Sequence, residues 1–156
     1  MSTNMVKIEV ATATLLQLDW LIAKCENEPI RFDGRELRYA PSQFSDERVY
    51  SPTTRPEQID KIIEREGITL IRAEDDYEVD AEGYCTETRI PQWFAECDAY
   101  LENSTITGYE GEYMESSFLI AEDGGYYDTT PWAAAARAYV AHRCNKTEYV
   151  PSYLCK

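Results

Sequence analysis

Residues 130–145 have the sequence TPWAAAARAYVAHRCN, which is the strongest structural signal in the chain. Thr130 is suited to a helix N-cap, and Pro131 to the first helical position, where the N–H that proline lacks would be unpaired anyway. The four alanines at 133–136 lose no side-chain entropy in a helix and allow a neighbouring backbone to approach closely. Asn145 is expected to end the helix in the left-handed conformation. The stretch therefore predicts a helix that packs tightly on a sheet.

Two further helices are expected earlier in the chain. Thr14 is the predicted N-cap of the first, whose apolar side chains recur on one face as far as Cys25. The second is expected to begin at Thr54 or Arg55 and to close at Gly67, which suits the left-handed position after a helix. Both helices should bury one face and expose the other.

The strands expected between these helices are short. They have alternating or β-branched apolar residues bounded by turn residues, as at Asp33-Gly34, which predicts a hairpin. They are residues 6–10, 30–32, 37–39, 68–71, 93–97 and 118–121. A chain of 156 residues has the size of one domain. The expected fold class is α+β, with a small, mostly antiparallel sheet packed on three helices in a single domain, residues 1–156.

The net charge of −14 is concentrated in the middle of the chain. Residues 74–128 contain 16 acidic side chains and a single basic one, Arg89, together with 7 of the 12 tyrosines. Such a segment repels nucleic-acid phosphates and attracts cationic surfaces, so direct binding to nucleic acid is not expected. We expect residues 74–128 to form an acidic, tyrosine-rich insertion. It either contacts a basic partner or is a solvated face that keeps the protein soluble.

Several kinds of site and location are not expected. The five cysteines are at least 11 positions apart, which excludes a zinc-ribbon spacing, and the single His142 has no second histidine for a metal site. Glycine-rich phosphate-binding motifs are absent, so we expect no metal, cofactor or catalytic residue. No apolar run approaches the about 20 residues of a membrane span, and Met1–Ile8 lacks a signal-peptide core. Reduced thiols and a cytoplasmic location are therefore expected.

Three segments resemble a known family in sequence and in order. They are LDWLIAKCE (18–26), YSPTT (50–54) followed by IIEREGI (62–68), and TPWAAAARAYVA (130–141), with Val150-Pro151 near the end. Over residues 5–72 and 127–152 the chain resembles the domain-of-unknown-function family numbered 2591, small uncharacterised accessory proteins of tailed phages and prophages. Where that family usually has Gly-Gly before its central helix, this chain has RPEQID (55–60). The resemblance implies a phage accessory protein in the host cytoplasm, and it implies no particular reaction.

Two hydroxyl-rich loops, residues 50–54 and 128–131, precede expected helices. Backbone N–H groups and the helix dipole at such a junction attract phosphate or carboxylate, arginines pair with it, and aromatic rings stack on bases. The candidate ligand-binding residues are Tyr50, Ser51, Thr53, Thr54, Arg65, Thr130, Trp132 and Arg137. Each also has a structural interpretation: Thr54 and Thr130 as N-caps, Arg137 as a partner of Glu64 or Glu66, and the aromatic residues as core.

These residues lead to two functional hypotheses of different class. The first is a non-enzymatic anti-defence protein that binds and sequesters a small anionic immune signal of nucleotide type. The alternative is an acidic inhibitor that uses residues 74–128, as a nucleic-acid mimic, against a host defence protein. A carboxylate-based hydrolase comes third, because accidental carboxylate pairs are expected among 29 acidic side chains. Neither a ligand nor an oligomeric state follows from the sequence, and self-association stays open.

Overall fold

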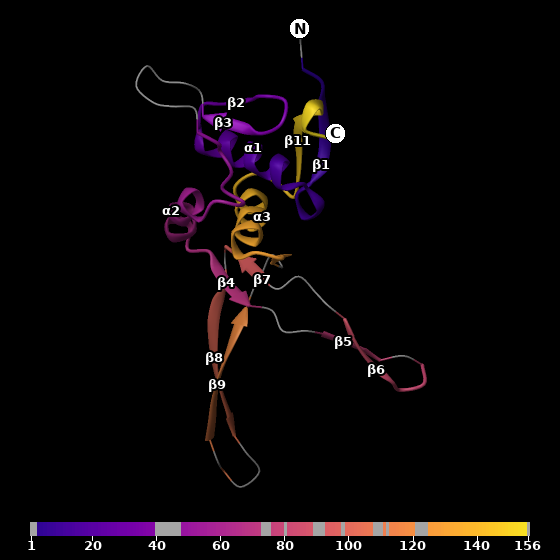
Figure 1. The fold of residues 1–156 in the computed structure, drawn as a ribbon. Coiled ribbons are helices and arrows are strands. Elements are labelled where there is room, and N and C mark those ends of the chain that lie inside the picture. Colours follow the sequence, from indigo (N-terminus) through magenta and orange to yellow (C-terminus); the bar gives the residue numbers. More distant parts are fainter. Residues whose placement is uncertain are drawn as a thin grey trace.

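The α+β class expected from the sequence is confirmed by the computed structural model, which contains three helices and several small antiparallel sheets (Figure 1). The structure describes residues 3–39, 48–72, 76–79, 81–88, 93–97, 99–107, 111, 113–120 and 125–155. The helices are α1 (Leu15–Glu26), α2 (Pro56–Glu66) and α3 (Pro131–Arg143), with short 3-10 turns at Val10–Thr12 and Ser152–Cys155. None of the helices described is long and apolar enough to cross a membrane.

Helix α1 begins at the N-cap expected from the sequence. The backbone N–H of Gln17 donates to Thr14 Oγ1 at 3.2 Å, and the backbone N–H of Thr14 donates to Gln17 Oε1 at 3.0 Å. Two N–H groups that the helix leaves unpaired are satisfied in this reciprocal arrangement. The helix ends at Asn27, whose φ of 56° is left-handed.

The ends of α2 and α3 agree with the expectations for Arg55, Gly67 and Thr130, and they differ for Thr54 and Asn145. Gly67 closes α2 with a φ of 61°, and Thr130 Oγ1 caps α3 by accepting from the Ala133 N–H at 3.2 Å. The N-cap of α2 is Arg55, which makes no side-chain cap, so the alternative start at Thr54 is wrong. Asn145 does not have a positive φ, because the chain leaves α3 at Cys144 with a φ of −108° and then enters strand β11 at Thr147.

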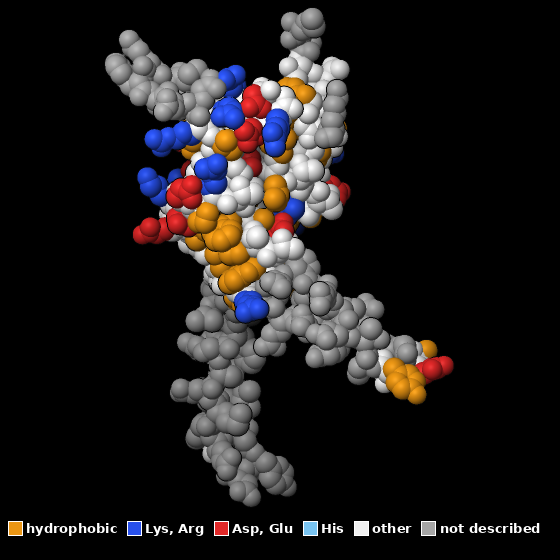
Figure 2. Space-filling view, viewed as in Figure 1, with side chains coloured by type: hydrophobic (Ala, Val, Ile, Leu, Met, Phe, Trp, Pro, Cys, Tyr) orange, Lys and Arg blue, Asp and Glu red, His pale blue; other side chains and the backbone are white. Residues whose placement is uncertain are grey.

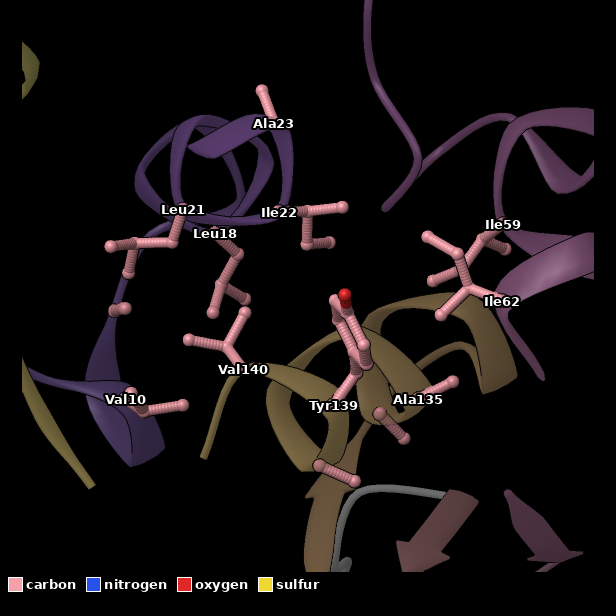
Figure 3. Packing of buried hydrophobic residues seen from close by; sticks show 14 of the residues in the cluster. Val10, Leu18, Leu21, Ile22, Ala23, Ile59, Ile62, Ala135, Tyr139 and Val140 are labelled. Carbon is pink, nitrogen blue, oxygen red and sulfur yellow. The ribbon is translucent and has the colours of Figure 1, made fainter. Parts of the chain in front are cut away.

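Helix α3 lies at the centre of the core, as its alanines predict. Ala134, Ala135 and Ala136 are fully buried, and α3 packs on strands β7 (Trp93–Glu96) and β10 (Tyr126–Asp128). Figure 3 shows Tyr139 pointing from α3 into the space between α1 and α2. The small alanine side chains thus let the sheet approach one side of α3 while larger side chains fill the other.

The strands form separate small sheets. Strand β7 is central in a three-stranded antiparallel sheet between β4 (Thr69–Arg72) and β10, while β1 (Met5–Glu9) pairs with β11 (Thr147–Pro151). Strand β2 (Ile30–Phe32) pairs with β3 (Leu37–Tyr39) around the predicted Asp33-Gly34 turn. The strand expected at residues 6–10 is β1, but Val10 belongs to the following 3-10 turn and Val6 is exposed.

The acidic insertion contains two hairpins. Strand β5 (Asp76–Val79) pairs with β6 (Cys85–Thr88), and β8 (Tyr100–Thr107) pairs with β9 (Tyr113–Ile120). The strand expected at 118–121 is the end of β9, and residue 121 lies outside the residues described. Both hairpins extend away from the three helices (Figure 1).

Candidate functional site

Asp19 in α1 anchors the first hydroxyl-rich loop. Its carboxylate accepts from the backbone N–H of Thr53 at 2.9 Å and from the Ser51 hydroxyl at 3.0 Å. Asp19 is 3 % exposed and Thr53 is 1 % exposed. The loop before α2 is therefore fixed to α1 by a buried carboxylate.

The environment of Asp19 changes its acidity. Burial raises the pKa of Asp19 to about 7, although the N–H and hydroxyl of Thr53 and the hydroxyl of Ser51 act in the opposite direction. The Thr53 hydroxyl lies near the carboxylate but makes no hydrogen bond of standard geometry. Asp19 is thus a buried acid that exchanges its proton near neutral pH.

The loop uses its own polar groups internally. The backbone N–H of Ser51 donates to Gln58 Oε1 at 2.6 Å, and those of Thr54 and Arg55 donate to the Ser51 carbonyl at 3.1 and 2.8 Å. The hydroxyls of Ser51 and Thr54 are 2.6 Å apart and share a hydrogen bond. Binding of an anion by these groups would require them to exchange the partners that they have.

Tyr50 lies in the core beside this loop. It is 4 % exposed, and its ring meets that of Tyr39 edge-on with the centroids 5.1 Å apart. Burial raises the pKa of the Tyr50 phenol, and the nearby ionisable groups, Tyr39 first among them, raise it further. The structure therefore places Tyr50 in a packing position with no exposed face for a base.

Arg65 at the end of α2 is exposed and paired. Its guanidinium donates to both carboxylate oxygens of Glu26 at 2.8 and 2.9 Å and to Glu66 at 3.0 Å. Glu26 also accepts from the Tyr139 hydroxyl at 2.7 Å. Burial raises the pKa of Glu26, but the hydrogen bonds from Arg65 and Tyr139 outweigh it, so that the net pKa is lowered. This cluster connects all three helices.

Arg137 in α3 is held from three sides. Its Nε donates to Asp128 Oδ2 at 2.7 Å, and its Nη1 donates to the carbonyls of Val10 and Ala13, each at 2.8 Å. Its side chain is only 11 % exposed. The expected partners Glu64 and Glu66 are therefore wrong for Arg137, because α3 points this side chain towards β10 and the start of α1.

The two hydroxyl-rich loops have separate surroundings. Thr130 caps α3, and Trp132 is half-buried against the core. In the described part of the chain, no hydrogen bond, ion pair or ring contact joins residues 50–54 to residues 128–132. Whether these residues bind a ligand stays a prediction.

The sequence analysis missed a pocket of about 260 Å³ at the end of α3. Glu96 of β7, Tyr126 of β10 and His142 of α3 line it, together with Lys146 after the helix. Only packing brings these residues together, and no sequence spacing relates Glu96 to His142. Among the residues described, no three or more His, Cys, Asp or Glu side chains are placed to hold one metal ion.

Comparison with known proteins adds no family to this geometry. No protein-family model matches the chain, and no curated protein matches it. The arrangement around Asp19, Arg65 and Arg137 is therefore interpreted from its own contacts.

Proposed function

We propose that this protein is a non-enzymatic binding protein that uses its two acidic hairpins to hold a basic surface of a protein partner. One observation carries the proposal: the acidic insertion forms hairpins β5–β6 and β8–β9, whose strands pair with no other strand among those described. A segment whose only task was to add charge to the body would have no need of paired strands that extend beyond it (Figure 1).

The charge of the hairpins supports a basic partner. Residues 76–88 contain five acidic and no basic side chains, and residues 100–120 contain four and none. On the body, by contrast, acidic and basic side chains are interspersed around α1 and α2 (Figure 2). Single-sign charge on a projecting element attracts an oppositely charged partner from a distance and suppresses other partners.

The open edges of the hairpins offer a second mode of contact. A two-stranded sheet has unpaired backbone N–H and C=O groups on both outer edges, and an extended segment of a partner can pair with them. An isolated hairpin is marginally stable in water, so a partner would also stabilise it. Together with the resemblance to phage accessory proteins, these features favour a host defence protein as the partner.

The test uses immobilised full-length chain and a bacterial lysate at low and high salt. Wild-type protein is expected to retain a basic protein at low salt and to lose it as salt rises, because exposed charges are screened within about 8 Å at physiological ionic strength. The triple substitution Glu110→Gln, Glu112→Gln, Glu115→Gln should weaken this retention. Cross-linking followed by peptide mapping identifies the segment in contact.

A matched control removes three acidic groups from the body. Glu57, Asp60 and Glu64 are exposed on α2, and their replacement by Gln, Asn and Gln changes the net charge as much as the hairpin substitutions do. The control variant should retain the partner. Equal losses for both variants would show that total charge, and no particular surface, drives the binding, and would contradict the proposal.

Sequestration of an anionic nucleotide signal is the second candidate. The observation in its favour is Arg65, whose side chain is 51 % exposed, so that an anionic ligand could compete with Glu26 and Glu66 for the guanidinium. Purified protein should then lower the concentration of a free cyclic nucleotide signal and release it intact on heating. Arg65→Ala should abolish the effect, and capture that survives this substitution in a folded protein would exclude the Arg65 site.

A further inference from the structure

Two cysteines from distant parts of the chain lie together on the surface. Cys25 is in the last turn of α1, and Cys144 directly follows α3, 119 positions later. Both are half-buried, both are free thiols, and both line one pocket of about 400 Å³. Cys144 is also close enough to Cys25 to contribute to the raised pKa of the Cys25 thiol.

Neighbouring contacts hold the two thiols in place. Glu26, the residue after Cys25, accepts a hydrogen bond from Tyr139 in α3. Leu21, one turn before Cys25, is fully buried near Val140, which is also fully buried (Figure 3). The ends of α1 and α3 are therefore fixed relative to one another. The packing of these two helices places both thiols at the same pocket.

Charged side chains line the pocket beside the two thiols. Lys24 and Arg143 line it beside the thiols, and Glu148 is the acidic residue on the same wall. Of these charged groups, Glu148 raises the pKa of Cys25 and Arg143 lowers it. Half-buried thiols in an open pocket are also accessible to a small oxidant.

We propose that Cys25 and Cys144 form an oxidation site, at which a hydroperoxide converts the two thiols into a reversible disulfide that joins α1 to α3. The Cys144 thiolate attacks one peroxide oxygen, the O–O bond breaks, and the hydroxide that leaves is protonated to water. The Cys144 sulfenic acid is then attacked by the Cys25 sulfur. The S–S bond forms, the S–O bond breaks, and the hydroxide that leaves takes up the proton of Cys25 and becomes a second water. The two sulfurs together lose two electrons to the peroxide.

The order of the two steps follows from the surroundings of Cys25. Burial raises the pKa of Cys25 to about 12, and the hydrogen bond and charge of Cys144 contribute to this. Cys25 therefore remains protonated and is a poor first nucleophile. The electrostatic contribution of Cys144 that raises the pKa of Cys25 is absent once Cys144 is an uncharged sulfenic acid, so the second attack becomes easier.

The experiment treats the reduced full-length chain with hydrogen peroxide. Remaining thiols are then alkylated, and the protein is digested without reduction. The expected product is a cross-linked pair of peptides containing Cys25 and Cys144, which a thiol reductant separates. Thermal unfolding before and after oxidation should show a rise of several degrees in Tm, because the disulfide closes a loop of about 100 residues or more and restricts the unfolded chain.

Single variants separate this pair from the other thiols. Cys25→Ser should leave Cys144 to accumulate as sulfenic acid, detectable with a dimedone probe, whereas Cys144→Ser should leave Cys25 unmodified. Cys155→Ser removes an exposed cysteine outside the pair and should give the same cross-link as wild type. Disulfides between other cysteines, between two chains, or no disulfide at all in a protein that stays folded would each overturn the proposal.

Discussion

The carboxylate of Asp19 accepts a hydrogen bond of 2.9 Å from the backbone N–H of Thr53, 34 residues later in the chain. Both residues are almost completely buried, so this bond fixes the entry to α2 against α1 away from solvent. Asp19 and Thr53 lie in two segments that are far apart in the sequence. Their contact therefore joins α1 to the loop before α2.

Asp19 is expected to make the stability of the fold depend on pH. Its pKa is about 7 in the folded protein, whereas an unfolded aspartate titrates near about 4. The folded state binds the proton more tightly, so this stabilisation is complete below about pH 4 and is lost as pH rises towards 7. Asp19→Asn cannot titrate, so wild type should lose stability relative to the variant over this range, by a few kcal/mol. Urea unfolding at several pH values measures the difference, and a constant difference would show that the carboxyl keeps an ordinary pKa.

Arg137 is expected to be a structural residue. Arg137→Ala removes three hydrogen bonds and leaves the Asp128 carboxylate without this partner, which should lower the free energy of unfolding by about 2–4 kcal/mol. Arg65→Ala is the matched control, because its ion pairs are exposed and should contribute under about 1 kcal/mol. Chemical denaturation compares the two variants. Similar losses for both would mean that the burial of Arg137 has no energetic weight.

The alanine face of α3 is expected to resist larger side chains. Ala135 and Ala136 are fully buried, so Ala135→Leu or Ala136→Leu adds volume to a closely packed region and should destabilise the protein by about 1–3 kcal/mol. His142→Leu introduces the same side chain at an exposed position of the same helix and should have a much smaller effect. Denaturation midpoints give the comparison. Equal midpoints for the buried and exposed leucine variants would contradict the close packing.

Gly125 is expected to be intolerant of a side chain. A methyl group there would overlap the ring of Phe94 and lie 2.7 Å from the carbonyl oxygen of Ala95. Gly125→Ala should therefore displace Phe94 and lower stability, on the order of 1–3 kcal/mol. Gly125→Ala should cost less stability in a Phe94→Leu background than in the wild type, since the smaller leucine side chain leaves space for the added methyl group. A double-mutant cycle by thermal unfolding tests this, and strict additivity would argue against the clash.

Local signals in the sequence were sufficient for the helices and for about half of the strands, whereas β10 and β11 were not expected. Thr14, Thr130 and Gly67 act through groups within four residues, so their roles could be predicted from neighbours alone. The prediction of a left-handed Asn145 was wrong because the conformation of this residue depends on the path of the chain after α3. Asn145 Nδ2 donates to Glu148 Oε1 at 3.1 Å, and the backbone enters β11 two residues later.

The contacts of the candidate site residues, by contrast, could not be predicted from neighbours along the chain. The sequence indicated which residues carry hydroxyls, guanidinium groups and aromatic rings, but the partners of Arg65 and Arg137 come from other elements. The shared pocket of Cys25 and Cys144 could not be predicted from the sequence either, because 119 positions separate the two cysteines and no short motif relates them.

The sequence by itself therefore determined the α+β class, the caps of α1 and α3, and the concentration of charge in residues 74–128, because each depends on composition or on neighbours along the chain. Only the tertiary structure decided that Arg137 is enclosed, that Asp19 is buried beside Thr53, and that two thiols share a pocket. These contacts form between segments brought together by burial of the alanine face of α3, and burial changes the acidity and the free partners of a side chain in ways that its sequence neighbours do not specify.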